Sequence, residues 1–277
     1  MRFDDKVVIV TGAGSGIGLA TARLFAREGA HVVVAEFDER RGRAAQEELR
    51  AAGGDAFSVR CDVASEAEVT GVVDAAFARH GRLDIVVNNA GYTWDGMAHK
   101  MADEQFRAML EIHTVVPFKV LRAAAPYLRD AGKKDKEAGR EVFRKVVNVT
   151  SISGTQGNVG QVNYASAKAG LVGLTKTLAR EWGPFKVNVN AAAFGFVETR
   201  LTASSEEGVT IERAGEEIAL GIPSQMRELA ATIIPLGRAA TPEEAAGAIF
   251  FLCSPWSNFV QGQVLTVNGG QMTGMTS

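Results

Sequence analysis

Short runs of apolar, mostly β-branched residues alternate along the chain with longer segments in which apolar residues recur at helical spacing. The short runs predict seven strands, at Val7–Val10, Val32–Ala35, Phe57–Arg60, Ile85–Val87, Val146–Val149, Val187–Asn190 and Val264–Val267. The longer segments predict helices near 17–28, 39–52, 66–80, 103–129, 164–182 and 242–253. This alternation predicts an α/β fold, a doubly wound parallel sheet with helices on both faces.

The domain organisation follows from what interrupts this alternation. No linker rich in Pro, Ser or charge divides the 277 residues, so we expect one domain over 1–277. Residues 130–144 are rich in Lys, Asp, Glu and Gly, which predicts a solvated surface insertion. Residues 200–237 follow the sixth strand and predict a segment that covers the substrate.

Charge and composition exclude several classes of function. The 30 basic and 32 acidic residues are spread along the chain, so no basic face for nucleic acid is expected. No stretch approaches the roughly 20 apolar residues of a membrane span, and the polar start at Met1–Asp5 does not resemble a secretory signal. Cys61 and Cys253 are too few for a disulfide framework or a zinc site. We expect a cytoplasmic protein without a metal.

A glycine-rich loop follows the first predicted strand, in the sequence Thr11-Gly-Ala-Gly-Ser-Gly-Ile-Gly18. Glycines permit a tight turn and a close approach to phosphate, and the start of the next helix favours an anion. The spacing Gly12-x-x-x-Gly16-x-Gly18 differs from the usual G-x-G-x-x-G, so a plain tight turn is the alternative. Its position after the first strand favours the pyrophosphate of a dinucleotide.

Glu36 ends the second predicted strand, where a carboxylate can accept hydrogen bonds from both hydroxyls of an adenosine ribose. The carboxylate would repel a 2'-phosphate, and Phe37 stands where a basic residue would bind one. This favours NAD(H) over NADP(H), although Arg40 and Arg41 are close in sequence. The alternative is that Glu36 only caps or solvates the next helix.

Two further groups follow strands at the same predicted edge. Asp62, after the third strand, could contact the adenine amino group, and the alternative is that it caps the next helix. Asn88-Asn89-Ala90-Gly91 follows the fourth strand and adds two short amides and a glycine.

Tyr164-Ala-Ser-Ala-Lys168 places a phenol and an ammonium on one face of a helix. A nearby cation favours the ionised phenol, so Lys168, with an oxidised nicotinamide, is expected to lower the pKa of Tyr164 from about 10. An exposed surface pair is the alternative.

Ser151 follows the fifth strand and could hydrogen-bond a substrate oxygen beside the tyrosine, with Ser153 as the second candidate. No G-x-S-x-G elbow or His–Asp arrangement accompanies the serine, so serine hydrolase chemistry is disfavoured.

The glycine loop, the Asn-Asn-Ala-Gly turn, Ser151 and Tyr164-x-x-x-Lys168, in this order, make the chain resemble the short-chain dehydrogenase/reductase family over nearly its whole length. The resemblance implies a Rossmann-type domain that forms a homo-oligomer, a tetramer or dimer. It also implies that Tyr164 is the acid/base, that Lys168 binds the nicotinamide ribose and lowers the tyrosine pKa, and that Ser151 positions the substrate. The cofactor site is then expected to comprise Gly12, Ser15, Gly16, Ile17, Gly18, Glu36, Phe37, Asp62, Val63, Asn89, Ala90, Gly91, Tyr164, Lys168, Gly195, Val197 and Thr199.

The sequence departs from the family pattern at two positions. His113 stands where relatives have an asparagine that supports a water chain to the lysine, and it could serve as a fourth catalytic residue in that relay or simply pack in its helix. Ala193-Phe194-Gly195 replaces the usual proline-glycine pair, which leaves the loop geometry beside the nicotinamide open. Val197 and Thr199 still match the segment that binds the carboxamide in relatives.

The stretch 154–164 is similar to members that act on 3-oxoacyl thioesters, both acyl-carrier-protein reductases and 3-hydroxyacyl-CoA dehydrogenases, and His113 also resembles the latter. We therefore expect an NAD(P)(H)-dependent oxidoreductase that interconverts 3-oxoacyl and 3-hydroxyacyl thioesters. A dehydrogenase of a steroid, sugar or small alcohol, a dehydratase or epimerase on the same fold, and a catalytically weak NAD-binding regulator are the alternatives.

Overall fold

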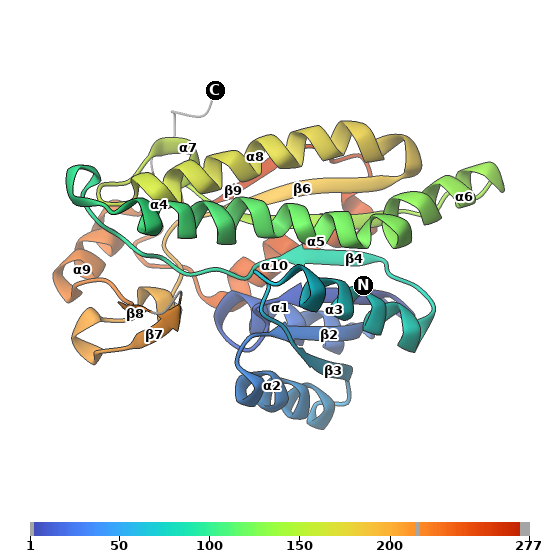
Figure 1. Cartoon of the computed structure of the whole chain (residues 1–277), viewed down its shortest axis with the longest axis horizontal. Coiled ribbons are helices and arrows are strands. Elements are labelled where there is room, and N and C mark those ends of the chain that lie inside the picture. The colour runs from blue at the N-terminus through green and yellow to red at the C-terminus, as the bar shows by residue number, and fades with distance from the viewer. Residues whose placement is uncertain (1–2, 214–215, 272–277) are drawn as a thin grey trace.

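A seven-stranded parallel sheet forms the centre of the protein (Figure 1), in a computed structural model that describes residues 3–213 and 216–271. The order of its strands is β3-β2-β1-β4-β5-β6-β9. All seven predicted strands and the doubly wound fold are confirmed. The strands are β1 (Val7–Thr11), β2 (His31–Glu36), β3 (Asp55–Arg60), β4 (Ile85–Asn88), β5 (Arg144–Ser151), β6 (Val187–Phe194) and β9 (Val264–Val267).

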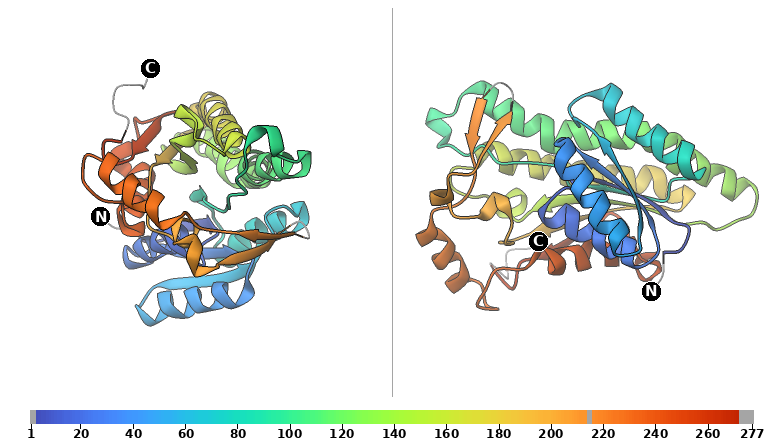
Figure 2. Two further views of the ribbon diagram at one scale, coloured as in Figure 1. Left: turned by 90° about the vertical axis from the view of Figure 1, so that its left-hand side faces the viewer. Right: turned by 90° about the horizontal axis from the view of Figure 1, so that it is seen from below.

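Helices cover both faces of this sheet (Figures 1 and 2). The α-helices of the described residues are α1 (Gly16–Arg27), α2 (Glu39–Ala51), α3 (Glu66–His80), α4 (Asp103–Leu110), α5 (Val116–Ala125), α6 (Ala131–Glu137), α7 (Ser153–Gln156), α8 (Val162–Trp182), α9 (Ser224–Ile233) and α10 (Pro242–Cys253). None of the helices in the described part of the chain combines the length and the apolar character that a membrane span requires.

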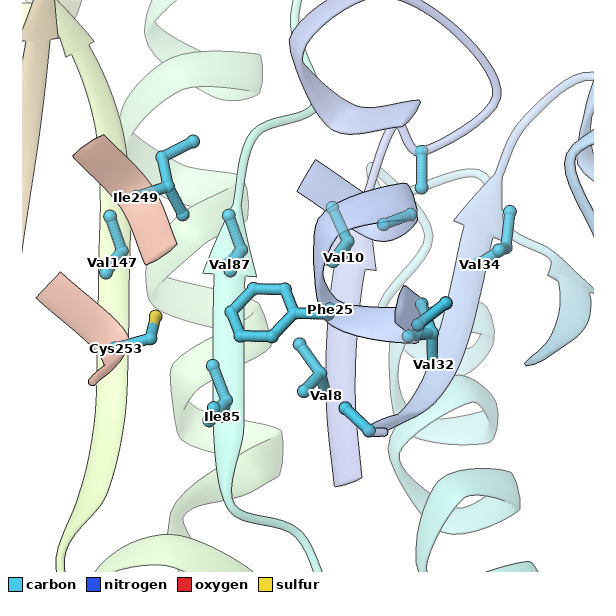
Figure 3. Close-up of a cluster of buried hydrophobic side chains, with 14 of the residues drawn as sticks. Val8, Val10, Phe25, Val32, Val34, Ile85, Val87, Val147, Ile249 and Cys253 are labelled. Carbon is cyan, nitrogen blue, oxygen red and sulfur yellow. The ribbon is translucent and has the colours of Figure 1, made fainter. Parts of the chain in front are cut away.

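Alternate residues of the strands enter two separate cores. Val8 and Val10 of β1 pack in one core with α1 and α10, where Phe25 and Ile249 meet the sheet (Figure 3). Val7 and Ile9 face the opposite core, which α3, α5 and part of α8 cover. Because both faces of central strands such as β1, β2 and β4 are buried, these strands are nearly continuous apolar runs, which is why they could be recognised in the sequence.

Side-chain caps fix where several helices begin. Thr241 and Glu244 form a capping box around Pro242, and α10 has the predicted bounds 242–253. Ser65 caps α3 by accepting a hydrogen bond from the amide of Glu68. The alternative that Asp62 caps this helix is therefore wrong, since its carboxylate instead accepts from the amide of Ala64, 3.0 Å away, in the preceding turn.

The helix predicted over 103–129 is longer than expected. Single π-helical turns at Glu111–Val115 and Pro126–Asp130 join α4, α5 and α6, so helical structure continues to Glu137. The segment 130–144 is thus a helical extension and a turn, which projects at one end of the molecule (Figure 1). Asp135 within it is buried and binds Arg140 and Arg144 at 2.7 and 2.8 Å, an ion-pair network that holds the extension against the start of β5.

The segment 200–237 contains a small hairpin that the sequence did not predict. Strands β7 (Thr210–Arg213) and β8 (Glu216–Ala219) pair antiparallel, and α9 follows them. Hairpin and α9 lie at the end of the molecule opposite α6, and they face the viewer in the left view of Figure 2.

The strand order reverses between β1 and β4. From β1 the chain passes to β2 and β3 on one side, and it returns to pair β4 with the other side of β1. In doubly wound sheets ligands bind at the carboxyl ends of the strands beside such a reversal. A ligand site is therefore expected at the carboxyl ends of β1 and β4.

Candidate functional site

The loop between β1 and α1 requires glycine at two positions. Gly12 has a positive φ of 67°, and a Cβ on it would lie 2.9 Å from Cα of Ala90 in the loop after β4. A Cβ on Gly18 would overlap the carbonyl oxygen of Gly12. The loop therefore closes tightly over the start of α1, which leaves backbone N–H groups for an anion.

Thr11 and Asn89 tie this loop to the end of β4. The Thr11 hydroxyl accepts from the amides of Asn89 and Ala90, each at 3.0 Å, and the Asn89 side chain donates to the Thr11 carbonyl at 2.9 Å. The side-chain amide of Asn89 thus stabilises the glycine loop. Ala90 and Gly91 follow it at the carboxyl end of β4. The part played by Thr11 could not be predicted from the sequence, because its partners are mostly backbone atoms.

Glu36 reaches into the glycine loop. One carboxylate oxygen accepts from the amide of Gly14 at 2.9 Å and the other accepts from the amide of Asp38 at 3.2 Å. The capping alternative for Glu36 is wrong, since Asp38 caps α2 through the amide of Arg41 at 3.1 Å. The buried carboxylate of Glu36 therefore lies against the glycine loop.

Two basic residues near Glu36, Arg41 and Arg60, contact neighbouring side chains. Arg41 lies 3.4 Å from the carboxylate of Asp38, and the guanidinium of Arg60 lies over the ring of Phe37, 5.4 Å from its centroid. At the end of β3, the amide of Cys61 donates to the carbonyl of Glu36, which places Asp62 next to this site; Val63 is buried in the adjacent core.

Ser15 and Ile17 stand at the start of α1. Ser15 is its extended N-cap residue, but its hydroxyl makes no capping hydrogen bond. Ile17 is partly buried and packs on the core beneath the loop. The hydroxyl of Ser15 is therefore not used by the helix.

The loop after β6 covers the glycine loop from the other side. A Cβ on Gly16 would lie 3.4 Å from the methyl group of Thr199, and Val197 is buried and pairs with Ala240. Gly195 passes so close to Asn268 that a Cβ would lie 2.8 Å from it. Phe194 remains within β6, beside Ser151 on one side and Val267 on the other, so its replacement of proline extends the strand.

Ser151 and Tyr164 meet at the carboxyl end of β5. Ser151 is the last residue of β5 and Tyr164 lies in the first turn of α8, and the Ser151 hydroxyl is close enough to the phenol to affect its pKa. Ser153 supports this pair, because its amide donates to the Ser151 hydroxyl at 3.1 Å. The structure thus brings Ser151, rather than Ser153, to the phenol.

Burial raises the pKa of Tyr164 to about 12; the hydrogen bond from Ser151 opposes this rise and the charge of Asp95 adds to it. This direction is opposite to the one expected from Lys168. The protein's own groups therefore keep the phenol protonated near neutral pH.

Lys168 is buried one helical turn from Tyr164. Its ammonium donates to the carbonyl of Val149 at 2.7 Å and lies 5.6 Å from the centroid of the Tyr164 ring. Burial lowers the pKa of Lys168 to about 7. The alternative of an exposed surface pair is wrong, because the lysine is only 4 % exposed.

His113 lies beside Tyr164, on the π-helical turn between α4 and α5. Its Nε2 lies 2.7 Å from the carbonyl of Tyr92, so Nε2 carries the hydrogen of the neutral ring. Its other nitrogen, Nδ1, is buried without a hydrogen-bond partner in the described parts of the chain. Burial, followed by the charge of Lys168, holds the pKa of His113 well below its usual value.

An apolar cluster borders Tyr164. Tyr92, Met109 and Ile218 are buried together, and Leu201 and Ile211 pack against them, as does Tyr164 itself. Ile218 and Ile211 belong to the β7–β8 hairpin, so the segment 200–237 reaches the phenol. Residues far apart in sequence form this wall, which is why sequence patterns did not reveal it.

The described residues also contain one group with the chemistry of metal ligands, His31, Asp55 and His80. His31 and Asp55 begin β2 and β3, at the edge of the sheet opposite the site, and their side chains lie 2.6 Å apart. The two imidazoles stack with centroids 4.3 Å apart, so their in-plane lone pairs do not converge on one point.

Comparison with known proteins gives consistent matches over the whole chain. A family model described as enoyl-(acyl carrier protein) reductase matches residues 12–272. A 3-oxoacyl-[acyl-carrier-protein] reductase FabG of Thermotoga maritima is 36% identical over 98% of this chain and 99% of its own length. The short-chain reductase protein NovJ of Streptomyces niveus is also 36% identical, over 96% of this chain and 94% of its own.

A solved structure is similar in fold as well as in sequence. It is a 7α-hydroxysteroid dehydrogenase complexed with NADH and 7-oxoglycochenodeoxycholic acid, with a TM-score of 0.84 and 30% identity. The match covers 99% of this chain and 97% of that one.

Proposed function

This chain belongs to the short-chain dehydrogenase/reductase family, and we propose that it reduces 3-oxoacyl thioesters with NADH. Members of this family are NAD(P)-dependent oxidoreductases that act on CH–OH and ketone groups. The observation that carries the proposal is the placement of the Ser151 hydroxyl beside the phenol of Tyr164. This pair borders an apolar wall, and the glycine loop, whose Gly14 amide donates to the carboxylate of Glu36, lies at the same ends of the parallel strands. The relatives named as 3-oxoacyl reductases direct the choice of substrate.

The residues around the loop after β1 fit a dinucleotide. Gly12 and Gly18 let the loop turn tightly against the end of β4 and the start of α1, which would present backbone N–H groups to a pyrophosphate, and Thr199 lies close to Gly16. When bound, the reduced nicotinamide supplies a hydride to the carbonyl carbon. Glu36 would accept hydrogen bonds from the ribose hydroxyls and repel a 2'-phosphate, which supports a preference for NADH.

Tyr164 is the proton donor in this proposal. Its pKa of about 12 keeps the phenol protonated near neutral pH, so it holds the proton that the substrate oxygen takes up when the hydroxyl forms. Ser151 would donate a hydrogen bond to the same oxygen and fix its position.

Lys168 is the group that can return a proton to Tyr164. Its pKa of about 7 lets the amine gain or release a proton near neutral pH, and it lies beside the phenol ring. His113 is a positioning residue, because its ring abuts both Tyr164 and Gly91 and its Nδ1 can accept one hydrogen bond.

The segment 200–237 covers the substrate in this account. Its residues Leu201, Ile211 and Ile218 complete the apolar wall beside Tyr164. An acyl chain would lie against this wall, since apolar contact there removes it from water.

We also propose a homo-oligomer in the cytoplasm. Trp256 and Phe259, between α10 and β9, are 78% and 104% exposed, which indicates a surface that a second copy would cover. Both cysteines are free and buried, in keeping with a reducing compartment.

Ketosteroid reduction is the second candidate, favoured by the similarity to the 7α-hydroxysteroid dehydrogenase structure and by the apolar wall. Oxidation of NADH by purified protein with acetoacetyl-CoA, and separately with a 7-oxo bile acid, tests the two. Reduction of the thioester at the higher kcat/KM supports the proposal, whereas reduction of the bile acid alone would replace it. Binding of NADH without turnover of either would favour a regulator.

A further inference from the structure

A cavity of about 400 Å³ opens where the loop after β6 meets the segment 200–237. The residues that line it are Glu198, Thr199, Arg200, Ala203, Val209 and Arg227. Two arginines and one glutamate are therefore among the lining residues. The cavity is richer in positive charge than in negative charge and suits an anion.

The cavity lies between the two halves of the proposed site. Thr199 contacts the glycine loop at Gly16, and Leu201 belongs to the apolar wall beside Tyr164. Arg200 stands between these two residues in a single 3₁₀ turn, Arg200–Thr202. A ligand whose anionic group binds there could therefore extend between the glycine loop and the apolar wall beside Tyr164.

Arg227 supplies the second indication of a ligand. It lies in the first turn of α9, and its Nε is buried but has no hydrogen-bond partner among residues 3–213 and 216–271. A buried N–H without an acceptor is costly, and a phosphate oxygen would satisfy it with a charge-assisted hydrogen bond.

Glu198 lies close enough to Arg238 to interact with its guanidinium, and Arg238 is held by both oxygens of Glu244 at 2.7 Å. Arg238 is thus satisfied by protein groups, unlike the Nε of Arg227.

Building on the thioester function above, we propose that Arg200 and Arg227 bind the phosphate of the phosphopantetheine arm that carries the acyl group. Coenzyme A and acyl carrier proteins share this arm, so one phosphate site would serve either carrier. The cofactor pyrophosphate has the same chemistry, but the glycine loop and the start of α1 already provide for it. Arginine suits the role because its planar fork matches phosphate oxygens.

The test compares two substrates that differ in the arm. Acetoacetyl-CoA contains the phosphate, whereas acetoacetyl-N-acetylcysteamine has the same reacting thioester without it. We expect Arg227→Gln to lower kcat/KM for acetoacetyl-CoA by about tenfold or more, as loss of a charged hydrogen bond does, and to leave the cysteamine thioester within about twofold. Arg227→Lys should recover part of the loss, and Arg238→Gln, the matched control, should leave the ratio of the two substrates unchanged.

A second measurement does not depend on turnover of the longer substrate. Phosphopantetheine should inhibit reduction of the cysteamine thioester more strongly than pantetheine, and Arg227→Gln should remove that difference. Equal losses with both substrates, together with a raised KM for NADH, would assign the arginines to the cofactor and overturn the proposal, as would no change with either substrate. If the wild-type protein binds NADH but reduces neither thioester, the proposed thioester function is wrong, and the proposed phosphate site at Arg200 and Arg227 is then wrong as well.

Discussion

The imidazole of His113 lies edge-on to the phenol of Tyr164, with ring centroids 4.9 Å apart and an interplanar angle of 86°. On its other side the same imidazole meets the backbone of Gly91, where a Cβ would lie 2.9 Å from Nδ1 and would overlap Cε1. Substitution of histidine for the family's asparagine thus depends on a glycine in the Asn-Asn-Ala-Gly turn. His113 fills the space between that turn and the proton donor.

Gly91→Ala should destabilise the protein by about 1–3 kcal/mol, because the added methyl group overpacks against the imidazole. Combining it with His113→Ala should restore part of that loss, since the smaller side chain makes room. Thermal unfolding of the single and double variants measures the coupling. Gly71→Ala on α3 is the control, because nothing lies within 4 Å of its Cβ position, and it should not lower Tm. If the losses of stability in the two single variants simply add up in the double variant, the contact between residue 91 and His113 does not affect stability.

The stability of the protein should fall in acid partly through His113. Its pKa is well below 6.5 in the folded state, so the unfolded chain binds more protons once the pH drops below about 6.5. The free energy of unfolding should then decrease by up to about 1.4 kcal/mol per pH unit from this group. Urea unfolding of wild type and His113→Asn between about pH 7.5 and 5.5 measures the difference in slope. Parallel curves for the two proteins would mean that His113 titrates normally.

Glu36→Ala should reduce the preference for NADH over NADPH by about tenfold or more, because a charged hydrogen-bond acceptor and a source of repulsion are both removed. The ratio of kcat/KM for the two cofactors measures it. Glu39→Ala, three residues further and exposed, removes a carboxylate of the same charge and should leave the ratio unchanged. If both variants keep the wild-type ratio, discrimination lies elsewhere in the site.

Phe259→Lys should shift the protein towards smaller species in sedimentation velocity. A fully exposed phenylalanine gains about 1.5–3 kcal/mol when it is buried, and a lysine at the same place opposes association. Dilution of the wild-type protein under the same conditions provides the comparison. A wild-type protein that sediments as a monomer at all concentrations would contradict the proposed oligomer.

The sheet could be predicted because its central strands are buried on both faces, as Val7–Val10 shows. The helix α10 could be predicted because Thr241, Pro242 and Glu244 form a local cap. The β7–β8 hairpin escaped prediction because its strands are short, and one begins with the pair Glu216–Glu217, so no clear alternation is visible.

The candidate site was predicted as a set of residues, but its energetics were not. The motif Tyr164-x-x-x-Lys168 suggested a lowered phenol pKa, whereas burial, which a sequence does not display, raises it. The helix caps likewise could not be assigned from the sequence, because several acceptors precede each helix. Asp38 accepts from the amide of Arg41 in α2, whereas Asp62 accepts from the amide of Ala64 in the turn before α3. Arg227 has no motif around it and emerged only from its place on the cavity.

In the proposed reduction of a 3-oxoacyl thioester by NADH, Tyr164 donates the proton. NADH oxidation with acetoacetyl-CoA by wild type and Tyr164→Phe, measured alongside NADH binding to each, tests this role. We expect kcat to fall by about 10²–10⁴-fold in the variant while binding of NADH stays nearly unchanged. A variant that binds NADH and retains kcat within about threefold of wild type would contradict it.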